Sequence, residues 1–457
     1  MKKYDVIIVG GGPAGYIAAI KAARLGAKSA LFEKSAVGGT CLNRGCIPAK
    51  TYLKTAEIIG HIQNAHRRGI RIADARIKVD MEKAVAEKNK VVAKLTGGVS
   101  SLLKSNGVDV YFGEAKIRPD RTVSAGETVL AADKVIFAGG SKTAKLSLPG
   151  MDSARVLTSD DIFDIGRVPE SLAIIGGGVI GTEIASAFAA FGSRVTIIEL
   201  TGNVLPMADG DISNMIRKSL EKKGVTVYTE TKIERAEDTK DAIRVYTDKR
   251  QPVEAEYALM SVGRVPDLSA VEGLGLEIER GAVKTDDTMR TNIDWIWAPG
   301  DVNAKCMLAH AAFKMGETAA ENAMGRFKKA DLRYVPTCVY TNPEAGSAGL
   351  TERQAGEKYD ISVGMFPFSA NGRALASGET EGFVKIIADK KYGEVLGVHI
   401  VGPGAAEMIN EAAALMASEI TVNEIAGFVH GHPTYSEAFM EAAADSIGQC
   451  LHLPPKK

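Results

Sequence analysis

An internal repeat is the feature that most constrains how this 457-residue chain can fold. The segments YDVIIVGGGPAGYIAA and AKSALFEK return 166 residues later as SLAIIGGGVIGTEIAS and SRVTIIEL. Each copy contains a short β-branched apolar run, a glycine cluster, a helix-like stretch and a second apolar run. The repeat places Gly10, Gly12, Gly15 and Glu33 over Gly176, Gly178, Gly181 and Glu199. Short apolar strands that alternate with helices predict parallel sheets, so the expected fold class is α/β.

Both copies contain a Gly-x-Gly-x-x-Gly pattern that follows a predicted strand and begins a predicted helix. The first glycine makes the turn, the second admits a pyrophosphate, and the helix N-terminus stabilises its charge. Glu33 and Glu199 each follow the third glycine by 18 residues, where a carboxylate accepts hydrogen bonds from ribose hydroxyls. The alternative is that both glutamates only cap solvated strand ends. We therefore predict two bound dinucleotides, and Glu199 favours NAD over NADP because a carboxylate repels a 2′-phosphate.

Cys41 and Cys46, within GGTCLNRGCIPAK (residues 38–50), are the only close pair among five cysteines. A separation of five residues rises about 7.5 Å on an ideal helix, so a disulfide would require a distorted turn, which Gly45 and Pro48 could permit. A strained bridge is readily reduced, as a redox shuttle requires. Two alternatives stay open. The pair could be two inert buried thiols, or half of a zinc site that lacks a second close pair among Cys306, Cys338 and Cys450. We expect no metal.

A histidine near the C-terminus is a candidate base. His432 lies in HPTYSE (residues 432–437), and Glu437 follows it by five residues and could orient it. Thiol–disulfide exchange needs a base that generates the thiolate, which favours a catalytic role over an ordinary turn histidine. His310 and His452 are interpreted as structural.

The remaining sequence predicts a third unit and limits the partners. Helical periodicity covers residues 79–104, and near residue 334 a new pattern begins, with strands at 384–387 and 395–400 and a helix at 405–417.

Lys and Arg together number 56, and Asp and Glu together also number 56, so no basic field favours nucleic acid or an anionic membrane. No charge-free run of 18 apolar residues occurs, so no transmembrane helix is expected. Five cysteines are too few for a secreted disulfide framework, which predicts a cytoplasmic location.

Over essentially its whole length, the sequence resembles the flavin-dependent disulfide oxidoreductases. Besides the glycine turns and GGTCLNRGCIPAK, the resemblance rests on VGRVP (262–266), APGDV (298–302), GETEGFV (378–384) and HPTYSE. It implies two Rossmann-like dinucleotide-binding domains and an α+β C-terminal dimerisation domain. The implied boundaries are 1–146 for the FAD-binding domain, 147–269 for the NAD-binding domain, 270–336 for a central segment completing the FAD domain, and 337–457 for the dimerisation domain.

The resemblance also implies the cofactors, FAD at the first glycine turn and NAD at the second. Glu33 would bind the FAD ribose and Asp301 its ribityl chain. The further residues implied to contact cofactor are Lys50, Gly113 and Ala309 for FAD, and Glu199 and Gly263 for NAD.

A catalytic relay is implied as well. Lys50 would pair with Glu183 near the flavin, with Cys46 as the flavin-side thiol and Cys41 as the interchange thiol. His432 and Glu437 would act from the partner subunit, which implies an obligate homodimer.

Within the family, the sequence is most similar to members that oxidise dihydrolipoyl groups and reduce NAD+. Lipoyl groups of 2-oxoacid dehydrogenase or glycine-cleavage complexes are then the expected partners. The alternatives are a reductase of another small or protein disulfide, and a non-catalytic flavoprotein. Two departures from the family pattern stand out. Gly139 lies where a threonine is usual, and Arg44 could favour thiolate formation or simply face solvent.

Overall fold

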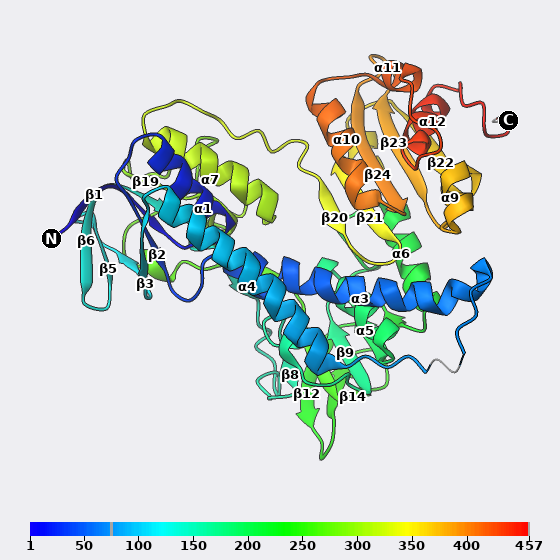
Figure 1. The fold of residues 1–457 in the computed structure, drawn as a ribbon, viewed down its shortest axis with the longest axis horizontal. Coiled ribbons are helices and arrows are strands. Elements are labelled where there is room, and N and C mark those ends of the chain that lie inside the picture. Colours follow the sequence, from blue (N-terminus) through cyan, green and yellow to red (C-terminus); the bar gives the residue numbers. More distant parts are fainter. Residues whose placement is uncertain (74–75, 456–457) are drawn as a thin grey trace.

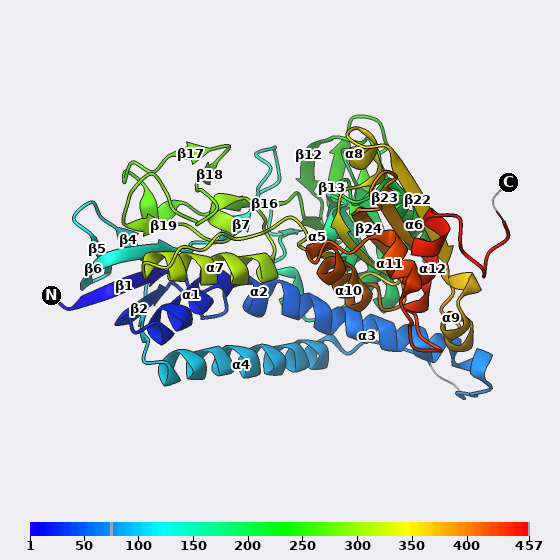
Figure 2. The same cartoon turned by 90° about the horizontal axis from the view of Figure 1, so that it is seen from above.

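The computed structural model describes residues 1–73 and 76–455 as a mixed α/β protein. Figure 1 shows three bodies, with the N-terminal sheet around β1, a second sheet around β9, and the C-terminal sheet around β23. The long helix α3 (Cys46–Asn64) runs from the first body past the other two (Figures 1 and 2). The predicted α/β class is confirmed.

The first sheet has the strand order β3-β2-β1-β6-β5-β4, and β19 also pairs with β6. β1 is parallel to both β2 and β6, and α1 connects β1 to β2. α7 packs beside α1 although nearly 300 residues separate them, as the ion pair between Lys21 and Glu317 illustrates (|i−j| = 296). The elements of this body are β1 (Lys3–Val9), α1 (Pro13–Arg24), β2 (Ser29–Glu33), α2 (Gly39–Arg44), α4 (Met81–Ser105), β3 (Asp109–Phe112), β4 (Lys116–Ile117), β5 (Thr122–Ala125), β6 (Thr128–Phe137), β17 (Ile278–Glu279), β18 (Ala282–Val283), β19 (Ile296–Trp297), η4 (Asp301–Asn303) and α7 (Ala309–Ala323). The short helix η1 (Ala65–Arg68) continues the far end of α3 (Figure 1).

The second sheet has the order β11-β10-β9-β15-β8, and β9, α5 and β10 repeat the arrangement of β1, α1 and β2. A separate antiparallel sheet, β12-β13-β14, lies against it. β7 and β16 pair in a two-stranded ribbon, at the two points where the chain passes between the first body and the second. The elements are β7 (Ser141–Thr143), β8 (Val156–Leu157), η2 (Ile162–Asp164), β9 (Ser171–Ile175), α5 (Val179–Phe191), β10 (Arg194–Ile198), α6 (Gly210–Lys222), β11 (Thr226–Tyr228), β12 (Ile233–Asp238), β13 (Ile243–Thr247), β14 (Val253–Ala255), β15 (Tyr257–Met260) and β16 (Arg264–Pro266). The short helix η3 (Ser269–Val271) packs on the first sheet.

The C-terminal sheet is antiparallel, with the order β20-β21-β24-β23-β22. β23 and β24 are buried along their whole lengths because helices cover them, including α10 and α12. The elements are β20 (Thr337–Val339), β21 (Glu344–Gly349), α8 (Glu352–Gly356), β22 (Ile361–Pro367), η5 (Phe368–Ala370), α9 (Gly372–Ser377), β23 (Phe383–Asp389), β24 (Val395–Gly402), α10 (Ala405–Ala417), α11 (Val422–Gly427) and α12 (Glu437–Ser446).

The helices and strands expected from periodicity are confirmed with small changes at their ends. The helix expected at 79–104 is α4, which begins one residue after Asp80 because that side chain accepts a hydrogen bond from the Lys83 N–H and caps it. The strands expected at 384–387 and 395–400 lie within β23 and β24, and α10 has the predicted bounds 405–417.

One apolar core joins α3 to the second body and to the C-terminal sheet. Tyr52 of α3 and Phe188 of α5 belong to the same buried cluster as Phe383 and Val401 of the C-terminal sheet. Within the described ranges, every helix is too short or too polar to cross a bilayer.

Candidate active site

The two glycine turns have the same design. A Cβ at Gly15 would lie 1.8 Å from the Gly10 carbonyl oxygen, and one at Gly181 would lie 2.0 Å from that of Gly176. These glycines are therefore required for the close packing of helix against strand. The second glycine of each turn is different, because a Cβ at Gly12 has no neighbour nearer than 3.8 Å and one at Gly178 has none within 4 Å.

The open space beside Gly12 lies at the start of α1, and that beside Gly178 lies at the start of α5. Gly12 is the N-cap of α1 and Gly178 is the N-cap of α5, and neither helix has a side-chain cap. The first-turn N–H groups of both helices are thus free of side-chain acceptors and can bind an anion. This arrangement fits a pyrophosphate at each turn, so the residues present fit FAD and NAD.

Glu33 and Glu199 hold equivalent positions at the ends of β2 and β10. Glu33 is 6% exposed and accepts hydrogen bonds from the N–H groups of Gly11 (2.7 Å) and Ser35 (2.9 Å). Glu199 is 7% exposed and accepts from the N–H groups of Gly177 (2.6 Å) and Thr201 (2.7 Å). The alternative that these residues cap solvated strand ends is wrong, because both are buried against a glycine turn.

The other residues expected to contact cofactor lie around the same turns. Gly113 follows β3, and its N–H donates to the Glu33 carbonyl oxygen at 2.9 Å, so the two residues are adjacent. Asp301 accepts a hydrogen bond from the Ser141 hydroxyl at 2.5 Å. Ala309 is the first residue of α7, and Gly263 precedes β16 with a φ of 109°.

Arg264, which sequence reasoning did not assign, connects these segments. Its guanidinium donates to the Ser141 hydroxyl (2.8 Å) and carbonyl (2.7 Å) and to the Thr40 hydroxyl (3.3 Å). It therefore ties β7 to the helix that carries Cys41. The VGRVP motif contained this arginine, but its contacts join positions more than 120 residues apart.

Cys41 and Cys46 lie on two helices that are separated by a break at Gly45. α2 ends at Arg44, Gly45 has φ −138° and ψ −108°, and α3 begins at Cys46. The distorted turn that the spacing required is therefore present at Gly45, whereas Pro48 lies buried inside the first turn of α3. Both cysteines are free thiols here, with Cys46 exposed and Cys41 half-buried.

The two thiols shift each other's acidity in opposite directions. A hydrogen bond from Cys41 lowers the pKa of Cys46 to about 7, and the nearby Lys50 cation adds to the lowering. The same hydrogen bond, together with burial, raises the pKa of Cys41. Cys46 is therefore the thiol that ionises first.

Arg44 faces solvent. Its side chain is exposed, and its guanidinium donates to the Ser35 hydroxyl at 3.3 Å. The leading charges that act on Cys46 are those of Lys50 and Glu183. The solvent-facing alternative therefore describes the position of Arg44, and its effect on thiolate formation stays a prediction.

Lys50 of α3 and Glu183 of α5 form an ion pair. The Lys50 ammonium lies 3.0 and 2.9 Å from the two carboxylate oxygens of Glu183, which is 4% exposed. Tyr340, beside β20, completes the group, because its N–H donates to Glu183 at 2.9 Å and its ring lies 4.3 Å from the Lys50 ammonium. Sequence reasoning missed Tyr340, since a backbone donor leaves no signal in a sequence.

His432, between α11 and α12, forms a pair with Glu437, the first residue of α12. The His432 Nδ1 lies 2.8 Å from Glu437, whose second oxygen accepts from the Thr434 N–H at 2.7 Å. Burial acts to raise the pKa of Glu437, but the hydrogen bonds from Thr434 and His432 outweigh it and lower that pKa. The His432 side chain is 76% exposed.

His432 lies apart from the cysteines of its own chain. Figure 2 shows α2 and α12 well separated along the long axis of the molecule. His310 instead contacts the Pro336 carbonyl (2.7 Å) and His452 contacts Glu441 (2.6 Å), as befits structural residues. In the described part of the chain, no group of three or more His, Cys, Asp or Glu side chains is arranged to hold a metal.

Two glycine turns that fit dinucleotides, together with an ionisable pair of thiols, define a class of protein. This class is the nucleotide-dependent oxidoreductases that act on dithiols and disulfides. The model of the pyridine nucleotide-disulphide oxidoreductase family matches residues 4–316, and that of its dimerisation domain matches residues 335–443. The chain belongs to the pyridine nucleotide-disulphide oxidoreductase family.

Similar proteins cover the whole chain. A dihydrolipoyl dehydrogenase of Bacillus subtilis is 40% identical over 453 residues, covering 97% of this chain and 99% of the relative. A dihydrolipoyl dehydrogenase of Thermus scotoductus is 39% identical and covers 99% of each chain. Among solved structures, the HOCl-induced flavoprotein disulfide reductase of Escherichia coli has a TM-score of 0.87 at 28% identity, covering 96% of this chain and 99% of its own. LpdA from Mycobacterium tuberculosis has a TM-score of 0.89 at 28% identity, with coverages of 97% and 99%.

These comparisons confirm the family, the oxidoreductase class, and FAD and NAD as the cofactors. The matched dimerisation domain supports a homodimer.

Proposed function

We propose that this chain is a dihydrolipoyl dehydrogenase, which oxidises dihydrolipoyl groups to the cyclic disulfide and reduces NAD+ to NADH. The observation that carries the proposal is the pair of thiols at the break between α2 and α3, beside the ion pair of Lys50 and Glu183. The enzyme predicted from the sequence is confirmed by full-length relatives that bear that name.

The unequal acidity of the two cysteines supports different roles for them. A substrate thiolate attacks the Cys41 sulfur of the Cys41–Cys46 disulfide, which forms a mixed disulfide and releases the Cys46 thiolate. Because Cys46 has the lower pKa, about 7, it is the better leaving group. The second substrate thiolate then attacks the substrate sulfur of the mixed disulfide, closes the lipoyl ring and releases Cys41.

His432 would take the protons of the two substrate thiols in these steps. Glu437 holds one nitrogen of the imidazole at 2.8 Å and leaves the other free toward substrate. Since His432 is exposed on its own chain, we place it in the site of the partner subunit.

Bound FAD would supply the two-electron acceptor that links the cysteine dithiol to NAD+. Its holding residues would be the first glycine turn with Glu33, Gly113 and Asp301, whereas the second turn with Glu199 would hold NAD. The overall reaction balances. The dihydrolipoyl dithiol loses two electrons and two protons, NAD+ gains a hydride, and one proton is released.

Steady-state turnover tests this proposal. We expect the purified FAD-loaded protein to reduce NAD+ with dihydrolipoamide, and to turn over far more slowly with NADP+ or with NADPH and oxidised glutathione. Cys41→Ser should abolish NAD+ reduction while the protein keeps its yellow flavin. A flavin-loaded wild-type protein with no dihydrolipoamide activity would contradict the proposal and point to another small or protein disulfide as substrate.

The partners follow from the same chemistry. We propose that the substrate dithiol is carried by the lipoyl groups of 2-oxoacid dehydrogenase or glycine-cleavage complexes, and that the enzyme is cytoplasmic. Five cysteines in 457 residues are too few for a secreted disulfide framework, which supports a reducing compartment.

A further inference from the structure

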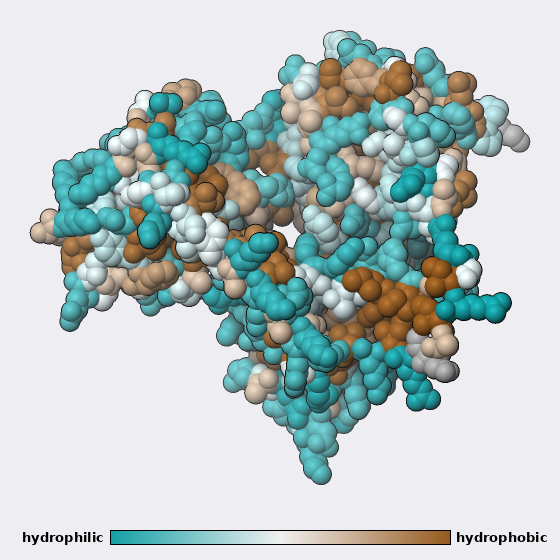
Figure 3. Space-filling model, viewed as in Figure 1, coloured by the Kyte–Doolittle hydropathy of each residue, from teal (hydrophilic) through white to brown (hydrophobic). Residues whose placement is uncertain are grey.

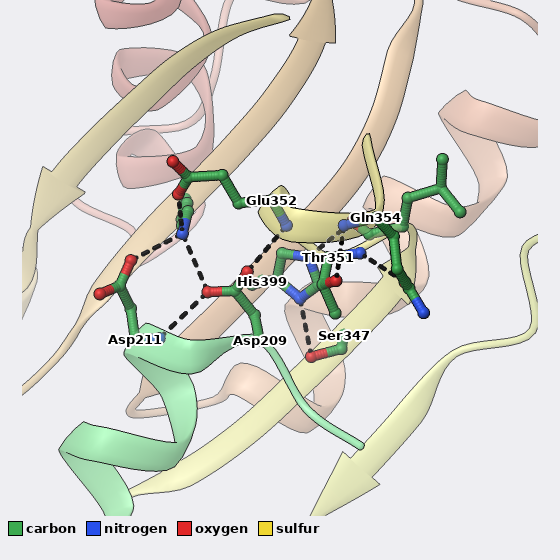
Figure 4. Close-up of polar contacts among 9 residues, drawn as sticks. Asp209, Asp211, Ser347, Thr351, Glu352, Gln354 and His399 are labelled. Atoms are coloured by element: carbon green, nitrogen blue, oxygen red, sulfur yellow. Dashed lines mark hydrogen bonds and ion pairs between the residues drawn. The ribbon is translucent and has the colours of Figure 1, made fainter. Parts of the chain in front are cut away.

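A buried lysine outside this site joins the second Rossmann-like body to the C-terminal sheet. The side chain of Lys385, on β23, is 2% exposed. Its ammonium lies 2.9 Å from Asp209, 2.6 Å from Asp211 and 2.5 Å from Glu352. Figure 4 shows these three carboxylates converging from the N-terminus of α6 and the start of α8. One cation thus holds together two bodies of the molecule.

Asp209 lies at the centre of this cluster. It is 2% exposed, and its carboxylate caps α6 by accepting from the Asp211 N–H (3.2 Å) and also accepts from the Glu352 N–H (3.0 Å). Burial acts to raise the pKa of Asp209, but the hydrogen bonds from Glu352 and Lys385 outweigh it and lower that pKa. Burial lowers the pKa of the neighbouring His399, which stays neutral and adds no positive charge. Lys385 is therefore the cation that balances Asp209.

The loop of residues 200–208 follows β10 and Glu199, precedes Asp209, and lies beside the second glycine turn. The Thr201 N–H and hydroxyl donate to the Glu199 carboxylate at 2.7 and 2.8 Å. The Leu205 N–H donates to the Gly177 carbonyl at 2.8 Å. The loop is thus anchored to the glycine turn at one end and to the Lys385 cluster at the other.

One face of the loop is open. Thr201, Asn203 and Pro206 line a cavity of about 820 Å³ that Lys385 also borders, and Met207 is 88% exposed. The middle of the loop is packed, because Val204 and Leu205 are buried. Pro206 and Met207 are exposed, so the end of the loop nearest Asp209 depends most on that anchor.

We propose that Lys385 is a positioning residue for the nicotinamide dinucleotide, because it holds Asp209 and thereby keeps the loop of residues 200–208 and Glu199 in place at the second glycine turn. The inference rests on the proposed function only in taking NAD as the ligand of that turn. Without the ammonium, three carboxylates face one another and repel, which drives the N-terminus of α6 away from β23. The loop loses one anchor, which loosens the contact that Leu205 makes with the glycine turn at Gly177.

Direct binding of NADH to the full-length, FAD-loaded dimer tests the proposal. In Lys385→Met we expect the Kd for NADH and the KM for NAD+ to rise about tenfold. The KM for dihydrolipoamide and the FAD content should stay at their wild-type values. Lys385→Arg, which keeps the positive charge, should recover most of the NADH affinity.

Lys390→Met is the matched control, since Lys390 directly follows β23 and forms an exposed ion pair with Asp360 at 2.7 Å. It should bind NADH as the wild type does. If Lys385→Met lowers the unfolding temperature but leaves the NADH Kd unchanged, the lysine is merely structural and the proposal is overturned.

A second variant covers the case in which Lys385→Met fails to fold. Asp209→Asn keeps a good N-cap of α6 but removes the charge that Lys385 holds, so the NADH Kd should rise in the same direction. An unchanged Kd in this variant would also overturn the proposal. A wild-type protein that binds no NADH would instead overturn the assignment of NAD to the second turn, and the inference with it.

Discussion

At the scale of single residues, Cys46 has its lowered pKa because of Cys41 and Lys50. Removing the Lys50 charge takes away a group that stabilises the thiolate, so Lys50→Met should raise the pKa of Cys46 from about 7 toward the ordinary thiol value. Since alkylation consumes the thiolate, the pH profile of Cys46 alkylation should move to higher pH. Iodoacetamide labelling of the reduced protein across pH, read by mass spectrometry, measures this.

Two neighbouring cations provide the controls for this prediction. Lys54 lies one turn further along α3, where it is exposed and paired with Glu57, so Lys54→Met should leave the profile unchanged. Arg44→Val should do the same, because its guanidinium contacts Ser35. A profile in Lys50→Met identical to the wild type would show that the Cys41 hydrogen bond alone sets the acidity of Cys46.

At the scale of elements, α5 contains one glycine that binding requires and another that folding requires. Gly178→Ala places a methyl group in open space at the helix N-cap, so we expect a stability loss of about 1 kcal/mol or less. The same methyl group obstructs the approach of a pyrophosphate, and NADH affinity should fall at least tenfold while FAD stays bound.

Gly181→Ala brings a Cβ within 2.0 Å of the Gly176 carbonyl and should destabilise the fold by about 3 kcal/mol or more. Thermal unfolding and NADH titration of both variants distinguish the two effects, and wild-type NADH binding by Gly178→Ala would contradict this role of the turn.

Elements of this kind could be predicted from the sequence because their signals are local. The glycine turns, the strand ends at Glu33 and Glu199, and α10 each depend on spacings of 18 residues or fewer. The pair of Lys50 and Glu183 spans 133 positions, so only the family resemblance could suggest it. Lys385 was missed although it interrupts the apolar run FVKIIA of the strand predicted at 384–387, which is buried in the structure. A charge in such a run must be paired, and that was the available signal.

At the scale of the whole molecule, one chain does not assemble the proposed active site. His432 is 76% exposed, whereas the cysteines lie on α2 and α3. An apolar patch covers the face over the C-terminal half of α3 (Figure 3), where Ile58 and Ile62 are 50% and 36% exposed. Val429, three residues before His432, is 99% exposed. Together with the matched dimerisation domain, these faces favour a homodimer in which each His432 reaches the other chain.

Heterodimers test that arrangement directly. Homodimers of Cys41→Ser and of His432→Gln should each be nearly inactive, the latter by a factor of about 10² to 10⁴. A heterodimer with one chain of each kind, isolated through two different affinity tags, contains one site with an intact cysteine pair from one chain and His432 from the other. It should therefore show about half of the wild-type NAD+ reduction rate per dimer. As the converse, a wild-type chain paired with a Cys41→Ser/His432→Gln chain should be inactive, because each of its sites lacks one component. Activity in this second heterodimer and none in the first would place His432 in the site of its own chain.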